Sequence, residues 1–198
     1  AAQSVGLSIP STLFSASKEQ LTDFWEEKNP VVTKALQDSF QLRLDNRAYM
    51  LYTEDVTLGD INELSDKVFP SLLQEKIEKD YEVRVFYLDG AFYSMAIFSQ
   101  LDAQTQTDFR KYNFAKMNRM VPYALPKDLE EKIIRLMKAI NLNTGSLDFL
   151  RRKNGEYVFL EVNPTGQFGF ISINCNYHLH REVTRYLAQE YLEKHGER

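Results

Sequence analysis

The arrangement of apolar and polar positions predicts two β-hairpins in this chain. Residues 82–100 and 145–163 each contain two runs rich in branched and aromatic residues. A dipeptide that favours a tight turn separates the runs, Asp89-Gly90 in the first stretch and Asn154-Gly155 in the second. Side chains alternate between the two faces of such a hairpin, so the turn dipeptide also predicts which residues lie opposite each other.

Helical periodicity marks three further stretches, in which apolar residues recur every three or four positions. These stretches are residues 18–28, 127–141 and 177–195. The last of them has Leu179, Val183, Leu187 and Tyr191 at i+4 spacing, which predicts one apolar stripe along the helix. Hairpins that alternate with helices predict an α+β layered fold.

The remaining stretches give weaker signals. Residues 30–36 and 48–53 are apolar runs that predict two strands paired with each other. Residues 71–77 change from apolar to polar, which predicts a strand end that becomes a connector. Residues 1–16 predict the end of a helix followed by a loop. Residues 101–126 predict a long irregular region, and loops of this length in a compact domain are usually functional or mobile.

The second hairpin has two acidic residues at positions that should face each other. If Asn154-Gly155 forms a two-residue turn, Asp148 lies opposite Glu161 and Ser146 lies opposite Asn163. The apolar residues Leu147, Phe149, Leu160 and Val162 then point to the other face. Like charges directly opposite are destabilising, so a hard cation such as Mg²⁺ between the oxygen atoms is one interpretation. An exposed face with two unrelated acids is the other.

Several basic residues are candidates for binding an anion. Lys34 lies at the end of a predicted strand and could contact phosphate as a point charge, although most such lysines are simply solvated. Arg84 lies between apolar neighbours on a predicted strand, so it either pairs with Glu82 or points at a ligand anion. Arg110 and Arg119 lie in the long loop and could bind phosphate or carboxylate.

The connector formed by Gln74, Glu75, Lys76 and Ile77 could present its backbone and one carboxylate to an adenine edge, but alone it is a very weak signal. The sequence contains no Walker loop and no Gly-x-Gly-x-x-Gly motif. Cys175 is more simply a buried thiol than a nucleophile.

Composition narrows the class of protein. The chain has 198 residues, 43% hydrophobic and 26% charged, which indicates a globular protein of one or two small domains. The net charge of −4 argues against a nucleic-acid partner. The single cysteine excludes an internal disulfide and predicts a reducing, cytoplasmic location. No run is long and apolar enough for a membrane span, and no signal peptide is visible.

Taken together, these motifs resemble an ATP-grasp ligase. The similarity is to the peptide-maturase branch, the graspetide or microviridin-type ligases, and especially the maturase of grasp-with-spasm systems. It rests on Gly-Ser-Leu-Asp-Phe at 145–149, on Phe-Leu-Glu-Val-Asn-Pro at 159–164, and on Gly-Gln-Phe-Gly at 166–169. Asp-Phe-Arg at 108–110 and the stretch 118–126 also fit. The resemblance covers nearly the whole chain.

The resemblance implies a role for each candidate. Asp148, Glu161 and Asn163 are similar to the Mg²⁺ ligands of the family. Lys34 is similar to the strand lysine on the ATP phosphates, and Gln74, Glu75, Lys76 and Ile77 to the connector that receives adenine. Arg84, Arg110 and Arg119 are similar to arginines that act on the phosphoryl group or the substrate. One departure is that residues 37–57 contain no glycine, although the family covers the phosphates with a Gly-rich flap.

The resemblance also implies an ATP-grasp fold with two α+β subdomains, residues 1–77 and 78–198, whose antiparallel sheets grip ATP. The implied activity is an ADP-forming, Mg²⁺-dependent ligase that forms ω-ester or ω-amide crosslinks in a ribosomal precursor peptide. An amino-acid ligase of the glutamate-adding type and a non-catalytic nucleotide- or peptide-binding module are the alternatives. We expect the family's N-terminal domain to be missing from this chain, and a homodimer to be possible.

Overall fold

The computed structural model describes residues 1–36, 42–44, 47–49, 51–111 and 117–196. The chain divides into two compact units. Unit 1 consists of residues 1–9, 80–98 and 119–198, and unit 2 consists of residues 10–79 and 99–118. The predicted division into 1–77 and 78–198 is contiguous, whereas here residues 1–9 join the later part of the chain and residues 99–118 join the earlier part.

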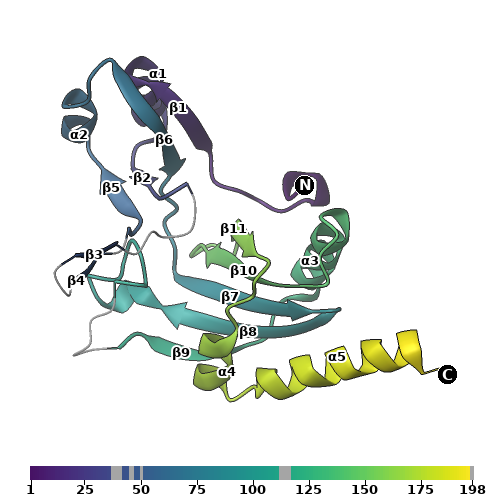
Figure 1. Ribbon diagram of the computed structural model, residues 1–198. Coiled ribbons are helices and arrows are strands. Elements are labelled where there is room, and N and C mark those ends of the chain that lie inside the picture. The colour runs from purple at the N-terminus through teal and green to yellow at the C-terminus, as the bar shows by residue number, and fades with distance from the viewer. Residues whose placement is uncertain (37–41, 45–46, 50, 112–116, 197–198) are drawn as a thin grey trace. The chain divides into compact units, whose positions relative to one another are not determined.

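Unit 1 is built on a five-stranded antiparallel sheet in the order β11-β10-β7-β8-β9. Its strands are β7 (Tyr81–Leu88), β8 (Ala91–Phe98), β9 (Arg119–Tyr123), β10 (Thr144–Arg151) and β11 (Tyr157–Asn163). The two predicted hairpins therefore form one sheet, with β7 and β10 as neighbours (Figure 1). Strand β9 was not predicted, because residues 119–123 were included in the irregular region.

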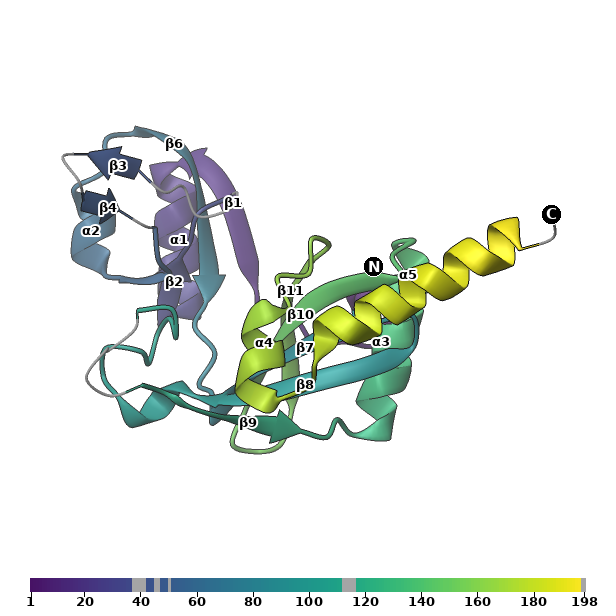
Figure 2. The ribbon, with the colours of Figure 1, turned by 60° about the horizontal axis from the view of Figure 1, so that its bottom comes forward.

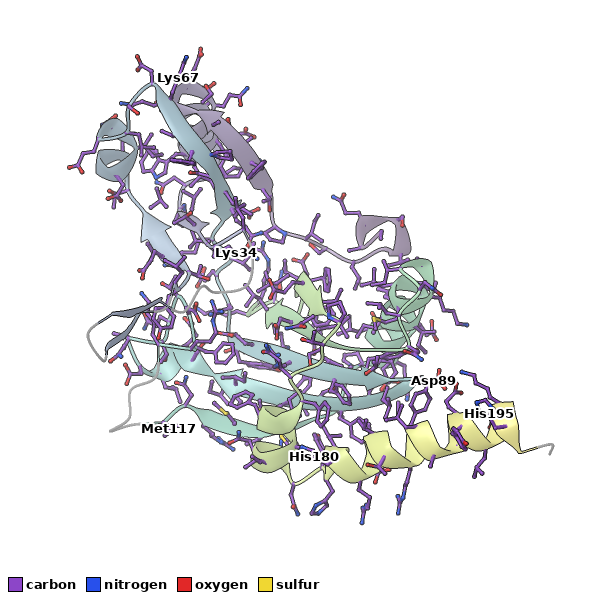
Figure 3. The ribbon with its side chains drawn as sticks, in the orientation of Figure 1. Lys34, Lys67, Asp89, Met117, His180 and His195 are labelled. Atoms are coloured by element: carbon purple, nitrogen blue, oxygen red, sulfur yellow. The ribbon has the colours of Figure 1, made fainter. Side chains whose placement is uncertain are left out.

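The β7–β8 hairpin has the predicted register. Asp89 and Gly90 both have positive φ, 43° and 91°, as a type I′ turn requires, and Arg84 lies opposite Met95. Figure 3 shows Asp89 at this turn.

One face of the sheet packs against α3 (Lys127–Ala139), the predicted helix 127–141. A short 3₁₀ turn, η1 (Gln3–Val5), lies beside this helix. The core here consists of alternate residues of β7 and β10 and the apolar stripe of α3, among them Val83, Val85, Leu147, Phe149, Ile133 and Met137. The alternation in the strands and the helical spacing in α3 therefore meet in one core.

Two further helices follow β11 in unit 1. Helix α4 (Gly169–Cys175) was not predicted, and α5 (Leu179–His195) corresponds to the predicted helix 177–195 (Figure 2). Leu179 is fully buried, but Leu187 and Tyr191 are 60% and 64% exposed. The apolar stripe predicted for this helix is therefore wrong beyond its first turns, since the half-buried side of α5 carries Glu182, Tyr186 and Glu190 instead.

Unit 2 contains a four-stranded antiparallel sheet in the order β1-β6-β2-β5. Its elements are β1 (Thr12–Ser17), α1 (Lys18–Lys28), β2 (Val31–Thr33), β5 (Glu54–Val56), α2 (Leu58–Asn62), β6 (Lys67–Glu75) and the 3₁₀ turn η2 (Ser99–Leu101). Leu21 of α1, Ile61 of α2 and Leu73 of β6 form its small core. The capped helix α1 matches the predicted helix 18–28, because the Ser17 side chain accepts a hydrogen bond from the Gln20 N–H.

Two predictions in unit 2 need correction. Residues 12–17 form strand β1, where a helix end and a loop were expected. Among the described residues, strand β2 pairs with β5 and β6 and not with residues 48–49 or 51–53. Residues 47–49 form β4 (Arg47–Tyr49), which pairs with β3 (Leu42–Leu44), and residues 51–53 are irregular. Much of the glycine-free stretch 37–57 lies outside the described residues.

None of the helices in the described part of the chain is both long enough and apolar enough to cross a membrane.

Candidate functional site

The predicted acidic face forms on β10 and β11. Asp148 lies opposite Glu161, and Ser146 lies opposite Asn163. Because side chains alternate along a strand, Asp148, Glu161 and Asn163 share one face of the sheet. Glu161 is exposed, and the Asp148 side chain is 21% exposed. Two carboxylates and an amide thus lie together near the β11 edge of the sheet.

The turn of this hairpin differs from the prediction. Arg152 N–H donates to the Glu156 carbonyl at 2.8 Å, which closes a loop over residues 153–155. Gly155 takes the left-handed conformation, with φ of 92°. A loop of this length with a left-handed residue at its end is the next most common hairpin connection after the two-residue turn. Relative to the predicted two-residue turn, this loop shifts the pairs nearest to it by one position, so that Arg151 lies opposite Tyr157.

A β-bulge then restores the predicted register. Phe149 lies opposite Phe159, but the next pair is Asp148 and Glu161, so Leu160 is the extra residue. Phe159, and not Leu160 as predicted, occupies the core face, and its ring centroid lies 5.4 Å from that of Phe149. The prediction missed both the longer loop and the bulge. Their effects on the register cancel, so the predicted pairing of Asp148 with Glu161 is correct.

Strand β7 adds an arginine to this face. Arg84 lies opposite Asp148, and its Nη1 donates to the two carboxylate oxygens at 3.0 and 3.2 Å. The Arg84 side chain is 12% exposed. Its Nε is buried and makes no hydrogen bond to any described residue. The sequence had suggested Glu82 or a ligand anion as the partner of Arg84; Asp148 was missed because it is 64 positions away.

Asn163 begins a tight turn that ends the hairpin. Its Oδ1 accepts hydrogen bonds from the Thr165 N–H at 3.0 Å and the Thr165 hydroxyl at 2.6 Å. Gly166 N–H donates to the Asn163 carbonyl at 3.1 Å, and the buried Ser146 hydroxyl donates to the Gly166 carbonyl. An amide oxygen has two lone pairs, so a cation bound by Asn163 Oδ1 would replace one Thr165 bond.

An aromatic cluster supports the chain after this turn. Gly166 has φ of 82°, and a Cβ at this position would lie 3.2 Å from the Phe86 ring. The Phe86 and Phe168 ring centroids are 4.9 Å apart, and the Phe168 and His180 ring centroids are 5.1 Å apart. Only glycine combines this backbone conformation with so close an approach.

These residues fit a hard divalent cation. Asp148, Glu161 and Asn163 offer only oxygen atoms, which is the donor type that Mg²⁺ prefers. Over the described ranges there is no cluster of three or more His, Cys, Asp or Glu side chains arranged to hold a metal ion. A cation here would therefore use the amide oxygen beside the two carboxylates.

The candidate adenine connector lies at the end of β6 in unit 2. Gln74 is buried, and its Nε2 donates to the Thr12 hydroxyl at 2.9 Å. The Glu75 carboxylate accepts a hydrogen bond from the Ser11 N–H at 3.2 Å. Ile77 is buried. Gln74 and Glu75 are thus tied to residues 11–12, Ile77 is buried, and strand β6 ends at Glu75.

The two candidate lysines of unit 2 follow strands β2 and β6. Lys34 lies one residue beyond β2 and is half-buried (Figure 3). Lys76 lies one residue beyond β6, where its Nζ pairs with Asp55 and donates to the Thr107 hydroxyl at 3.3 Å. Lys76 therefore contacts the segment that leaves β8.

Arg110 is paired with a buried carboxylate of its own segment. Its Nε and Nη2 donate to Asp108 at 2.9 and 2.6 Å, and the Thr53 N–H donates to the same carboxylate at 2.9 Å. Burial alone would raise the pKa of Asp108, but the hydrogen bonds from Arg110 and Thr53 and the Arg110 charge outweigh it and lower that pKa. The sequence singled out Arg110 and missed the role of Asp108, although the Asp-x-Arg spacing was a signal.

Arg119 is the first residue of β9 and not a loop residue. It is exposed, and its guanidinium lies 5.4 Å from the centre of the Phe98 ring. The predicted site residues therefore divide between the units. Unit 1 holds Arg84, Arg119, Asp148, Glu161 and Asn163, and unit 2 holds Lys34, Gln74, Glu75, Lys76, Ile77 and Arg110.

Two α+β units, one with an oxygen-donor face beside an arginine, define an ATP-grasp protein, and the α+β ATP-grasp fold expected from the sequence is confirmed. The family model of the RimK-like ATP-grasp domain matches residues 2–187, and the chain belongs to this family.

Solved structures of peptide ligases are similar to this chain. One is a RiPP-associated ATP-grasp ligase of Chryseobacterium gregarium in complex with ADP and a leader and core peptide. It is 26% identical, with a TM-score of 0.85, over 98% of this chain and 57% of that chain. Another is the macrocyclase MdnC of Microcystis aeruginosa bound with the precursor peptide MdnA. It is 29% identical, with a TM-score of 0.76, over 98% of this chain and 59% of that chain.

A third structure, the ATP-grasp ligase PsnB with a precursor variant, Mg and ADP, shares the fold at 18% identity and a TM-score of 0.71. The similarity covers 95% of this chain and 55% of that chain. The chain thus spans a little more than half the length of these relatives. No curated protein matches the sequence. The resemblance to peptide-crosslinking ATP-grasp ligases that the sequence indicated is confirmed.

Proposed function

We propose that this chain is the ATP-grasp part of a ligase that crosslinks a ribosomally made precursor peptide. The observation that carries the proposal is the Arg84–Asp148 pair beside Glu161, since it combines oxygen donors for a cation with fixed positive charge for a phosphoryl group. Family membership and the peptides and ADP in similar structures support it. A single, buried cysteine supports a reducing, cytoplasmic setting.

In this proposal Asp148, Glu161 and Asn163 hold Mg²⁺ together with ATP. When bound, the ion neutralises the phosphate oxygens. Asp148 would face the cation as well as Arg84, and the Arg84 guanidinium beside it would supply fixed positive charge for the transferred phosphoryl group. Arg84 cannot move far, because its side chain is nearly buried on β7. Fixed charge of this kind needs little reorganisation during reaction, which is why it lowers a barrier efficiently.

Residues of unit 2 bind the rest of the nucleotide. Lys34 contacts phosphate as a point charge. The connector receives adenine through Gln74, Glu75, Lys76 and Ile77, with the Glu75 carboxylate on the amino group. Arg110 and Arg119 bind the phosphate or carboxylate groups of the substrate.

The reaction has two transfers. A side-chain carboxylate of a substrate Asp or Glu attacks the γ-phosphorus, ADP leaves, and an acyl phosphate forms. A hydroxyl or amine of the same peptide then attacks the acyl carbon, phosphate leaves, and the product is an ω-ester or ω-amide. Each link removes one water from the peptide overall. Positioning and electrostatics suffice for both steps, so no covalent enzyme nucleophile is needed.

The test uses the full-length protein with its precursor peptide, ATP and Mg²⁺. We expect ADP release and a peptide mass lower by one water per link. Asp148→Asn and Glu161→Gln should each reduce kcat by about 100-fold or more, as lost electrostatic stabilisation does. Asp128→Asn, at an exposed position of α3, is the matched control and should leave kcat unchanged.

Other outcomes would identify a different function. The absence of both ADP release and a change in peptide mass would contradict the proposal. A mass gain on the acceptor would indicate an amino-acid ligase. Nucleotide binding that the two substitutions leave unchanged, without turnover, would indicate a non-catalytic module.

A further inference from the structure

A polar latch joins the segment after β8 to residues 53–55, at the start of β5 in unit 2. Thr107 donates its hydroxyl hydrogen to Asp55 at 2.9 Å, and Asp108 accepts from the Thr53 N–H at 2.9 Å. Lys111 donates to Glu54 at 2.7 Å. Residues 53–55 are thus each bonded to one residue of 107–111. We use the name latch for these contacts.

Thr107 connects the latch to the chain that follows β6. Its hydroxyl oxygen accepts from Lys76 Nζ at 3.3 Å while its hydrogen goes to Asp55. Lys76 Nζ also pairs directly with Asp55. The Thr107 carbonyl accepts from Lys79 Nζ at 3.5 Å, and Lys79 is only 8% exposed. Thr107 therefore contacts two lysines of the short segment that connects β6 to β7.

The charges in the latch favour this arrangement. Burial would raise the pKa of Asp55, but hydrogen bonds from Lys76 and Thr107 and the charges of Lys76 and Lys111 lower it. Asp55 therefore stays ionised and holds Lys76 by charge as well as by a hydrogen bond. The Thr107 hydroxyl accepts from Lys76 and donates to Asp55, so it bridges the two groups in addition to their direct ion pair.

The backbone of Lys76 is fixed from the opposite side. Its N–H donates to the Pro30 carbonyl at 2.9 Å, and Glu75 pairs with Val31 of β2. The backbone is thus held by β2 and the side chain by the latch. Loss of both Asp55 and Thr107 would release the Lys76 side chain and leave its backbone held by the bond to Pro30 and by the pairing of Glu75 with β2.

We propose that Thr107 and Asp55 are positioning residues for nucleotide binding, because they hold Lys76 and with it the connector 74–77. This inference rests on the proposed function, in which that connector receives adenine. The segment after β8 is distant in sequence from the connector 74–77. In this inference it contributes to the affinity for ATP and not to the chemical step.

The experiment compares Mg-ATP affinity and turnover of the full-length protein with those of Thr107→Val. Valine keeps the shape and the backbone carbonyl but removes both hydroxyl bonds. We expect the Kd and KM for ATP to rise about fivefold to tenfold, as for the loss of one or two hydrogen bonds, with kcat changed less than about twofold. Thr107→Ser keeps the hydroxyl and should keep the wild-type affinity for ATP. Thr22→Val, which removes a helix hydroxyl bond in α1, is the matched control and should leave it unchanged.

A double-mutant cycle with Asp55→Asn separates positioning from a general loss of stability. The effects of the two substitutions on ATP affinity should be less than additive, since both remove hydrogen bonds from the same Lys76–Asp55–Thr107 network. Wild-type protein that binds no ATP would overturn the proposed function and this inference together. If wild type binds ATP but Thr107→Val binds it equally tightly, this inference alone is overturned. The same holds if the substitution changes only kcat.

Discussion

Asp108 is a carboxylate with 4% of its side chain exposed, so its charge is tolerated only through its partners. Arg110 supplies a charged fork, and the Thr53 and Arg110 N–H groups supply two further donors. The residue therefore connects a segment inserted between two strands of unit 1 to the sheet of unit 2.

We predict that Asp108→Asn lowers the free energy of unfolding by about 2 kcal/mol at neutral pH, because hydrogen bonds to a charged group are lost. Urea unfolding checks this value. Asp128→Asn, on the exposed side of α3, should change it by less than about 0.5 kcal/mol.

The same substitution gives a pH prediction. The pKa of Asp108 is lower in the folded protein than in the unfolded chain. Its stabilisation is therefore fully present above the unfolded value, about pH 4, and is lost as the pH falls through the folded value. The difference in unfolding free energy between wild type and Asp108→Asn should shrink as the pH falls below about 4. A difference that grows on acidification would contradict this assignment.

At the scale of elements, the β10–β11 hairpin depends on its bulge. With the loop at 153–155 and no bulge, Asp148 would lie opposite Leu160, and Glu161 would lie on the apolar face. Strand β11 is the outermost strand of the sheet, and its other side makes an isolated bridge from Val158 to Ser8, so the extra residue interrupts one strand ladder, the one with β10. The position of the acidic pair is thus a property of the hairpin as a whole.

Two single-residue deletions distinguish the bulge from the regular strand. Removing Leu160 should leave Glu161 opposite Asp148, with Mg-ATP turnover retained. Removing Val162 should turn Asn163 to the apolar face and abolish turnover, because the side-chain period of a strand is two residues. Turnover and thermal unfolding of both variants measure this. Equal losses of turnover in two folded variants would contradict the register.

Sequence patterns predicted the elements whose burial follows their hydrophobicity. Helix α3 has four buried apolar residues at helical spacing. In β1 the pattern is inverted, since Phe14 is exposed and Ser15 is buried, so alternation could not reveal the strand. Strand β9 contains Pro122, a residue that is rare in central strands, but β9 lies at the edge of its sheet, where proline is tolerated.

The candidate site was predictable as far as it is local. Asp148 and Glu161 lie on one hairpin, so a turn dipeptide sufficed to place them on one face. The Arg84–Asp148 pair depends on β7 and β10 being neighbours, and the latch depends on residues about fifty positions apart. Neither contact leaves a periodic signal in the sequence, because periodicity reports only how one element faces its surroundings.

At the scale of the whole molecule, the two units are interleaved in sequence. The chain passes from one unit to the other after residues 9, 79, 98 and 118. Residues 10–79 contain the four-stranded sheet of unit 2 but lack the latch residues 107–111. The predicted subdomain 1–77 therefore omits part of the unit to which it corresponds most closely.

We predict that residues 10–79 alone unfold at lower urea concentration than the same residues joined to 99–118 through a flexible Gly/Ser linker. The linked protein regains the hydrogen bonds of Thr107, Asp108 and Lys111. Circular dichroism during urea titration measures the midpoint. Identical midpoints would show that the latch does not stabilise the sheet of unit 2.

The interleaving also orders events while the chain leaves the ribosome, because domains generally fold as units, beginning with the N-terminal one. Most of unit 2 is made before most of unit 1, but unit 2 lacks its last piece until residue 118 has been made, after the β7–β8 hairpin. That hairpin must in turn wait for β10 to cover its other side. A nascent chain therefore exposes the β7 edge, with Arg84 unpaired, until Asp148 emerges.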